Sequence, residues 1–272
     1  MVKTIRTTKL GKIELRLVEK DGRFFGLAIA ADGRKVAQVD GDVADDVWRL
    51  LHDEAGKGSA HYFGFDGARA RFLTFFPGGF HSEGFAAEER DYKVKAKTAL
   101  ETNAPVEEAA TGSGFGETVL AAFRATNMLF SVEKARIQEA MRGPSADRFV
   151  RAAARFAIGG GAPAELAEME AALAPHEIAK WTVVTYLPFL WRPEQHMFLK
   201  PEVTKDFAER VGHPYANRYE PRLDVGVYES LLDLTARTQA EIADLKPHDC
   251  IDVQSFIWVV GDYKEGRETP AP

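Results

Sequence analysis

The sequence of 272 residues contains a single cysteine, Cys250, so the chain cannot form an internal disulfide. A lone thiol is typical of a protein from a reducing compartment. The longest uncharged apolar run, 181–191, has 11 residues with Pro188 among them, whereas a membrane span needs roughly 20. No apolar stretch of the kind found in secretory signals follows the N-terminus. We therefore expect a soluble, cytoplasmic protein with no membrane partner.

Common catalytic and metal-binding motifs are also missing. The seven histidines form no HxxxH, HExxH or HxH pair, and one cysteine gives no structural zinc spacing. The glycine-rich segment 111–116 lacks the lysine and the GKS or GKT ending of a phosphate-binding loop, which favours a flexible linker. No GxSxG elbow occurs, and Cys250 has no obvious basic partner, so a packed thiol is favoured over a nucleophile. We predict no cofactor and no metal site, although histidines distant in sequence leave a metal open.

The distribution of charge is the clearest sign of a partner. The net charge of −6 argues against a protein that coats nucleic acid with its whole surface. Residues 1–36, however, hold nine basic and four acidic side chains, a local excess of +5 that leaves −11 for the other 236 residues. Such an asymmetry indicates an anionic partner for the N-terminal region.

The N-terminal region has the pattern of a β-sheet. Residues 12–19 alternate apolar and charged side chains, as in a half-buried strand. The pairs Asp21-Gly22 and Asp32-Gly33 suit tight hairpin turns. The expected elements are a short strand ending near Leu10, strands at 12–19, 23–30 and 34–39, and a helix at 43–54.

Helical patterns dominate the rest of the chain. An aromatic-dense stretch at 62–85 supplies the only large side chains for the core of an N-terminal domain, so we expect its rings to be buried. The runs 181–186 and 196–199 are β-prone and flank a four-residue loop, which predicts one β-hairpin. The expected helices are a short one before Pro77, one at 82–102, and further helices at 131–143, 145–158, 163–173, 202–211, 225–245 and 249–260.

These patterns predict an α+β fold, with a small N-terminal antiparallel β-sheet with helices followed by a mainly α-helical domain containing one β-hairpin. We expect the first domain at 1–102, a linker at 103–115 and the helical domain at 116–263. The polar tail, 264–272, is expected to fray.

A sheet followed by a helix is a scaffold that several DNA-reading modules use. Basic side chains around its hairpin turns would contact phosphates, which gives affinity without sequence readout. Three further basic residues share one face of the helix at 82–102 by their 3–4 spacing. The predicted nucleic-acid-binding residues are Lys12, Arg16, Lys20, Arg23, Arg34, Lys35, Arg90, Lys93 and Lys97. The alternative is a solvated sheet whose lysines prevent edge-to-edge aggregation.

The tip of the predicted hairpin is a second candidate site, because loop tips often make functional contacts. Its residues are Arg192, Glu194, His196 and Lys200. A turn that only packs is the alternative. Asp249 and Asp252 are carboxylates of the kind that a metal-dependent nuclease uses, but a helix cap and a favourable first-turn charge explain them better.

Residues 245–260, LKPHDCIDVQSFIWVV, resemble a segment of uncharacterised bacterial proteins, some of which accompany restriction or anti-phage genes. The resemblance implies an association with nucleic acid and assigns no catalytic residue. With the basic N-terminus, it predicts a nucleic-acid-associated protein of a bacterial defence or regulatory system. A metal-dependent phosphodiester hydrolase stays open, and so does a protein-interaction module that binds another copy of the chain or a different protein.

Overall fold

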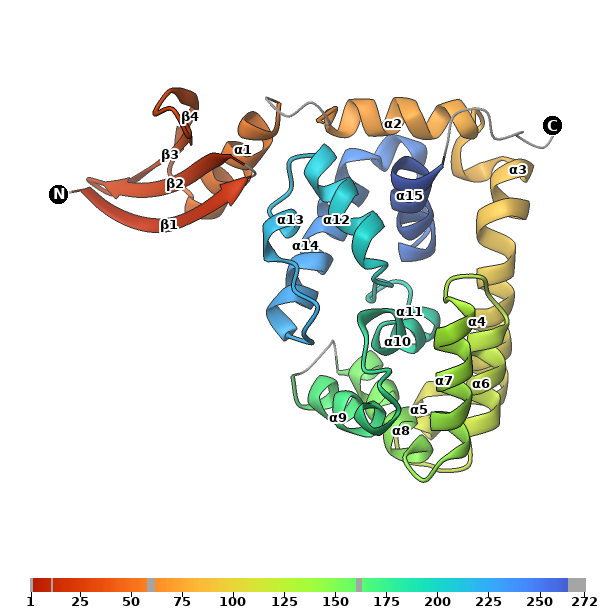
Figure 1. The fold of residues 1–272 in the computed structure, drawn as a ribbon. Helices are drawn as coiled ribbons and strands as arrows, with labels where there is room; N and C mark the ends of the chain where they lie inside the picture. The colour runs from red at the N-terminus through yellow and green to blue at the C-terminus, as the bar shows by residue number, and fades with distance from the viewer. Residues whose placement is uncertain (1, 11, 58–61, 160–162, 264–272) are drawn as a thin grey trace. The chain divides into compact units, whose positions relative to one another are not determined.

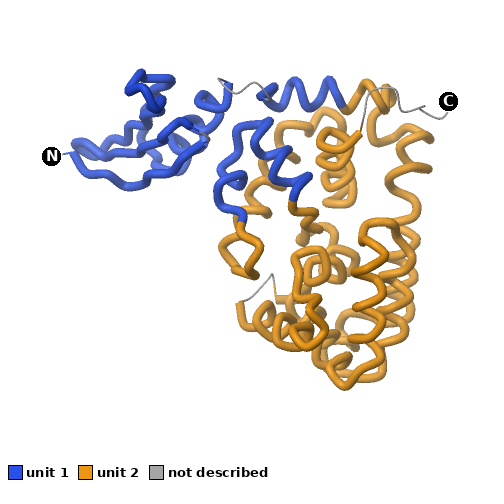
Figure 2. Tube along the Cα trace, in the orientation of Figure 1, with its two compact units in different colours: residues 1–71, 202–219 blue, residues 72–201, 220–272 orange. Residues whose placement is uncertain are grey.

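A computed structural model describes residues 2–10, 12–57, 62–159 and 163–263 (Figure 1). The chain divides into unit 1, residues 1–71 and 202–219, and unit 2, residues 72–201 and 220–272 (Figure 2). The predicted linker at 103–115 is wrong, because Val106–Ala109 forms helix α5 and its apolar side chains are buried within unit 2. The predicted frayed tail lies outside the described residues.

Unit 1 contains a four-stranded antiparallel sheet in the order β1-β2-β3-β4. Its strands are β1 (Val2–Leu10), β2 (Ile13–Lys20), β3 (Arg23–Ala30) and β4 (Lys35–Gly41). The three strands expected from the alternation are confirmed, and β1 is a full strand of 9 residues rather than a short one. Asp21 and Gly22 have φ angles of 54° and 78°, the positive values that a tight β2–β3 turn requires.

Helix α1 (Ala44–Gly56) packs on one face of this sheet and confirms the helix expected there. Leu15 lies opposite Ala28 and Leu17 lies opposite Gly26 in the register of β2 and β3, so these side chains point to the same face. Gly26 has no room for a side chain on this face, because a Cβ atom there would come within 2.8 Å of the Val39 side chain. The buried core between the sheet and α1 consists of Leu15, Leu17, Ala28, Val39, Val47, Leu51 and Ala55.

The other helical segments of unit 1 are the first part of α2 (Gly64–Phe75), α12 (Pro201–Arg210) and α13 (Tyr215–Arg218). Residues 202–219 belong to unit 1 although they follow most of unit 2 in sequence. A division of the chain into consecutive domains therefore does not describe this fold.

Unit 2 contains no strand among its described residues. Its helices are α3 (Glu83–Phe85), the π-helical turn η2 (Ala86–Arg90), α4 (Asp91–Asn103), α5, α6 (Gly116–Arg124), α7 (Ser131–Arg142), α8 (Ala146–Ile158), α9 (Pro163–Leu173), α10 (Trp181–Val184), α11 (Tyr186–Trp191), α14 (Val225–Glu241) and α15 (Cys250–Asp262). Shorter 3-10 turns are η1 (Gly79–His81), η3 (Ala174–His176) and η4 (Ala243–Leu245). None of the described helices combines the length and the apolar character needed to cross a membrane.

The β-hairpin predicted in this region is wrong. Its first arm forms α10 and α11, in which every side chain is buried, and 196–199 has no regular structure. A helix that is buried on all sides is apolar all round. Its sequence therefore shows no 3.6-residue period, and a short apolar run then cannot be distinguished from a buried strand.

The aromatic stretch at 62–85 contributes to the core, as expected, but most of its buried rings belong to unit 2. The ring of Phe72 lies 4.8 Å from that of Phe80 and 5.8 Å from that of Phe85. Phe256, from α15, completes the cluster at 5.1 Å from Phe72. The rings thus join α2 and the turns after it to the C-terminal helix.

Candidate functional site

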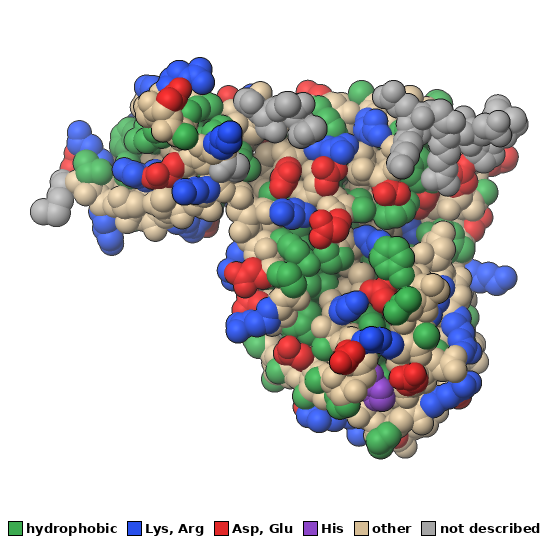
Figure 3. Space-filling view, in the orientation of Figure 1, with side chains coloured by type: hydrophobic (Ala, Val, Ile, Leu, Met, Phe, Trp, Pro, Cys, Tyr) green, Lys and Arg blue, Asp and Glu red, His purple; other side chains and the backbone are tan. Residues whose placement is uncertain are grey.

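The sheet of unit 1 has a second face, opposite α1, which we call the outer face. Residues that are paired across antiparallel strands point to the same side, so Arg16 and Leu27 share this face, as do Val18 and Phe25. The apolar side chains at its centre are only partly buried. Figure 3 shows Lys and Arg side chains beside hydrophobic ones over the strands of unit 1.

The strand register places five cations and two carboxylates on the outer face, around this apolar centre. They are Lys9, Arg16, Lys20, Arg23 and Lys35, with Glu14 and Asp40. Arg16 pairs with Glu14 and Arg23 pairs with Asp40, each at 2.6 Å. Because these pairs lie at the surface, each contributes at most about 1 kcal/mol to stability. An incoming anion can therefore displace the carboxylates at little cost.

The remaining predicted residues of unit 1 lie in the turns. Lys12 follows β1 and is exposed. Arg34 is also exposed, and its backbone N–H donates to Asp32 Oδ1 at 3.0 Å. The structure thus brings Arg16, Lys20, Arg23 and Lys35 to the outer face, leaves Lys12 and Arg34 at its rim, and adds Lys9, which the prediction omitted.

The other part of the predicted basic set is not a surface for phosphates. Lys93 is 1% exposed, so its prediction as a phosphate contact is wrong. Arg90 is held by two carboxylates of α15. Lys97 is partly buried on α4 within unit 2. The 3–4 spacing correctly groups these residues on one side of a helix, but that side faces protein.

Lys93 instead anchors a buried polar cluster. Its Nζ donates to Gln254 Oε1 at 2.7 Å and to Ser255 Oγ at 2.8 Å, and it pairs with Glu89 Oε2 at 3.3 Å. Tyr263 donates its hydroxyl proton to Glu89 Oε1 at 2.5 Å. Burial lowers the pKa of Lys93, whereas the Glu89 carboxylate acts in the opposite direction. Helix α4 is therefore joined to helix α15 by hydrogen bonds from the buried Lys93 ammonium to Gln254 and Ser255.

A second set of ion pairs lies one helical turn away. Arg90 binds both oxygens of Asp249, at 3.0 and 3.1 Å, and Asp252 Oδ1 at 2.6 Å. His248 donates from its backbone N–H to Asp252 Oδ2 at 2.8 Å. Burial opposes the charge of Arg90, but the hydrogen bonds and charges of the carboxylates hold its pKa above the usual value. Asp249 also caps α15 by accepting from Ile251 N, which confirms its predicted role.

Glu89 and Arg90 both belong to the π-helical turn η2, the widened turn between α3 and α4. Such turns are rare and occur frequently at functional sites. Here the turn supplies the Arg90 guanidinium to the carboxylates at the start of α15 and the Glu89 carboxylate to Tyr263, the residue after α15. It also lies at the edge of a small pocket that is lined by Glu89 and Lys93.

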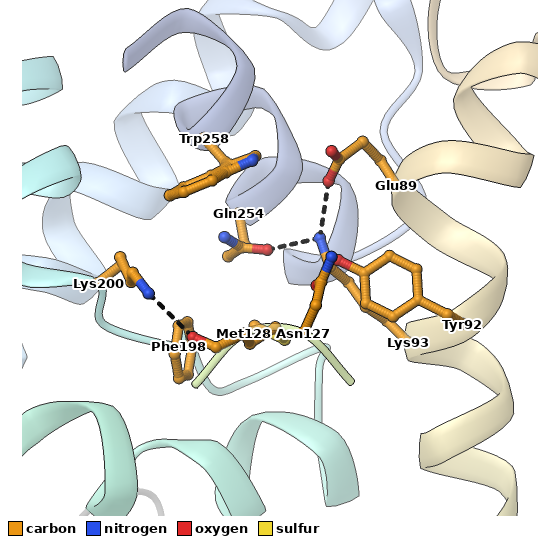
Figure 4. Close-up of a pocket in the computed structure, with 9 residues that line it drawn as sticks. All are labelled: Glu89, Tyr92, Lys93, Asn127, Met128, Phe198, Lys200, Gln254 and Trp258. Atoms are coloured by element: carbon orange, nitrogen blue, oxygen red, sulfur yellow. Dashed lines mark hydrogen bonds and ion pairs between the residues drawn. The ribbon is translucent and has the colours of Figure 1, made fainter. Parts of the chain in front are cut away.

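The pocket encloses about 60 Å³ within unit 2. Its walls come from η2 and α4, the loop between α6 and α7, the segment before α12, and α15 (Figure 4). Trp258 and Lys200 lie across the pocket from Tyr92 and Lys93 (Figure 4). The pocket therefore combines aromatic walls with amine, amide and carboxylate groups.

Lys200 is the second amine of the pocket. Its Nζ donates to the backbone oxygen of Met128 at 3.0 Å, and it lies 4.1 Å from the ring centre of Phe130 and 5.7 Å from that of Trp258. Cations are attracted to the faces of aromatic rings at such distances. Burial lowers the pKa of Lys200, and the charge of Glu133 opposes this effect.

The predicted loop site at 192–200 is not an exposed hairpin tip. His196 is fully buried, and its ring nitrogens lie 2.8 Å from the Tyr228 hydroxyl and 3.0 Å from the Ala157 oxygen. Arg192 pairs with Glu107. Glu194 is exposed. The prediction is therefore wrong for His196, which packs, whereas Lys200 does reach a pocket.

Cys250 is buried, and burial raises the pKa of its thiol to about 12. This confirms a packed thiol, because a nucleophilic cysteine needs a lowered pKa. Within the described parts of the chain, no three side chains of the types His, Cys, Asp and Glu are grouped so that they could hold a metal ion.

Sequence reasoning missed Glu89, Gln254 and Trp258 as pocket residues. The spacing of Glu89 and Lys93 at i and i+4 was an available signal, since such pairs attract on a helix. Gln254 and Trp258 share the same spacing on α15. Nothing in the sequence indicated that the two helices meet.

No protein-family model matches the sequence, and no match was found among curated proteins or solved structures. The resemblance of residues 245–260 to segments of bacterial proteins is not tested by these comparisons and stays a prediction.

Proposed function

We propose that this chain is a nucleic-acid-associated protein that contacts phosphates through the outer face of the unit 1 sheet. One observation carries the proposal: five cations and two carboxylates surround a partly exposed apolar centre on that face. Binding of this kind depends on the release of counterions from the phosphates and needs no base readout.

The charge of the whole unit supports this choice of surface. Unit 1 holds sixteen Lys and Arg residues and fourteen Asp and Glu residues, a net charge of +2, although the chain as a whole has −6. Lys9 and Lys20 are exposed. Arg16 and Arg23 are engaged only in surface pairs, which phosphate oxygens can replace.

The apolar centre gives the face a second kind of contact. Val18, Phe25 and Leu27 lie between the cations. Apolar side chains contact base edges in a groove, notably the methyl group of thymine, and several DNA-binding proteins place strands in a groove. An apolar centre with a cationic rim therefore suits a duplex better than it suits a free small anion.

A role in a bacterial defence or regulatory system follows from the resemblance of residues 245–260 and is part of the proposal. The metal-dependent hydrolase and the protein-interaction module remain predictions from the sequence alone.

The test is fluorescence anisotropy of a labelled DNA duplex, repeated with an RNA duplex. The test variant carries Lys9→Gln, Arg16→Gln and Lys20→Gln, which neutralise three cations of the outer face. Each phosphate contact adds about 0.9 to the steepness with which the logarithm of the binding constant falls with the logarithm of salt concentration. The loss of three contacts should therefore lower the affinity about a hundredfold at 0.15 M salt.

The control variant carries Lys95→Gln, Arg155→Gln and Lys180→Gln, which remove the same charge from exposed positions of unit 2. We expect this variant to bind like the wild type. Equal losses in both variants would mean that only net charge matters, and equal affinities in all three proteins would overturn the proposal.

A further inference from the structure

We propose that the pocket of unit 2 binds a small anion, a carboxylate or phosphate group, through Lys200 and the side-chain amide of Gln254. The site lies within one unit and does not depend on the proposed role of the sheet. The hydrogen-bonding groups that face the pocket and the volume of the pocket determine the class of ligand that it can bind.

The orientation of Gln254 is fixed by its partner. An ammonium group can only donate, so Gln254 must turn its carbonyl oxygen to Lys93 Nζ, as the 2.7 Å contact requires. The amide nitrogen consequently points away from Lys93 (Figure 4). Gln254 is only 6% exposed, and its NH2 group has no partner among the described residues. This NH2 group is therefore a donor, on a largely buried side chain, that is available to a ligand.

Lys200 also has donors to spare. An ammonium carries three N–H groups, and the described residues account for one of them, at Met128 O. The neighbouring rings of Phe130 and Trp258 attract the charge but accept no strong hydrogen bond. The partly buried charge is therefore poorly solvated, which is consistent with its lowered pKa, and an anion would restore the lost solvation.

The carboxylate in the pocket lining is already occupied. Glu89 is the one carboxylate in the lining, and its two oxygens face Tyr263 and Lys93. The lining thus has two amines and one carboxylate, and free donors outnumber free acceptors. A ligand that complements it must be rich in acceptors and negatively charged.

The volume limits the size of the bound group. A water molecule needs about 10–15 Å³ of such space, so 60 Å³ holds about four waters. That is enough for one carboxylate or one phosphate group. Asn127, in the lining, is exposed, so a larger molecule can enter with its anionic end and leave the remainder outside, against Trp258.

Thermal unfolding of the full chain tests this site. We expect sodium phosphate or sodium acetate, at millimolar concentrations, to raise the melting temperature in a saturable way, because binding to the folded state stabilises it. Sodium chloride at the same ionic strength should not do so. Comparison of phosphate with acetate decides which anion the site prefers.

Lys200→Met removes the charge and keeps the apolar stem, and Gln254→Glu keeps the contact with Lys93 and replaces the free donor with an acceptor. Each should weaken the apparent affinity about tenfold or more, which is what the loss of one charge-assisted hydrogen bond produces. Lys95→Met, an exposed lysine on the same helix as Lys93, is the matched control. An unchanged anion response in Lys200→Met would refute the proposal.

A wild-type measurement covers the case in which a variant does not fold. Trp258 lines the pocket, whereas the indole N–H groups of Trp181 and Trp191 are bonded to backbone oxygens. We expect phosphate or acetate to shift the Trp258 indole resonance in a nitrogen–proton NMR spectrum and to leave those two unchanged. No saturable shift, or equal shifts in all tryptophans, would contradict an anion site in this pocket.

Discussion

Replacement of Lys93 by methionine tests the buried cluster that joins α4 to α15. Methionine fills nearly the same space but carries no charge, so the carboxylate of Glu89 loses its cation and Gln254 and Ser255 lose their donor. Removal of one partner of a buried ion pair typically lowers the free energy of unfolding by about 3–5 kcal/mol, because the other charge stays buried without a partner. We expect Lys93→Met to destabilise unit 2 by about that amount.

The assay is urea denaturation, followed by tryptophan fluorescence, since Trp181, Trp191 and Trp258 report on unit 2. The double variant Lys93→Met with Glu89→Gln removes the orphaned charge and retains an acceptor for Tyr263. We expect it to recover more than 1 kcal/mol of the loss.

Lys95→Met serves as the control for helix propensity and surface charge, with an expected change within about 0.5 kcal/mol. A cost below 1 kcal/mol for Lys93→Met, or a double variant that is no more stable than the single one, would refute the account of Lys93 as the partner that compensates Glu89.

Three further predictions follow from burial. His52 is 1% exposed, and its burial, with a smaller contribution from the charge of His213, lowers its pKa from 6.5 to about 3. Below pH 6.5 the unfolded chain therefore binds a proton at His52 that the folded chain does not bind. The free energy of unfolding of unit 1 should consequently fall by about 2 kcal/mol between pH 7.5 and pH 5. His52→Phe should remove that part of the pH dependence in urea titrations at the two pH values, and an unchanged dependence would contradict it. Phe72→Ala should destabilise unit 2 by about 3–5 kcal/mol in the same assay, because it leaves a cavity among Phe80, Phe85 and Phe256, and a loss below 1 kcal/mol would contradict the packing described. Cys250, whose thiol has a pKa of about 12, should react with iodoacetamide at pH 8 much more slowly in the native protein than in urea, as mass spectrometry can measure; equal rates would show that the thiol is accessible.

Local patterns were sufficient for most of unit 1. The alternation in 12–19 and the two Asp-Gly turns predict β2, β3 and β4 because each signal depends only on neighbouring residues. Strand β1 was recognised only as a short strand, since its Thr and Lys residues alternate little in polarity. An edge strand buries few of its side chains, so its sequence is weakly constrained.

Long-range packing explains the errors. The helices α10 and α11 have no polar face to reveal their period, because they are buried on all sides. The return of 202–219 to unit 1 has no local signal at all. Sequence spacing likewise placed Arg90, Lys93 and Lys97 on one side of a helix, but Arg90 and Lys93 contact α15, about 160 residues further along the chain.

The pocket could be predicted in part. Lys200 was predicted as part of a site at a hairpin tip; the hairpin is absent from the described residues of unit 2, but Lys200 does line a pocket. Its partners Gln254 and Trp258 lie on a helix whose sequence indicates only an apolar stripe and a cap. The chemistry of the pocket depends on which helix meets which, and that is set by the fold.

The salt dependence of duplex binding tests the central claim most directly. If all five cations of the outer face contact phosphates, a plot of the logarithm of the binding constant against the logarithm of salt concentration should have a slope of about −4.5. The variant with Lys9→Gln, Arg16→Gln and Lys20→Gln should have a slope of about −1.8. A slope near zero for the wild type, or the same slope in both proteins, would contradict phosphate binding by this face.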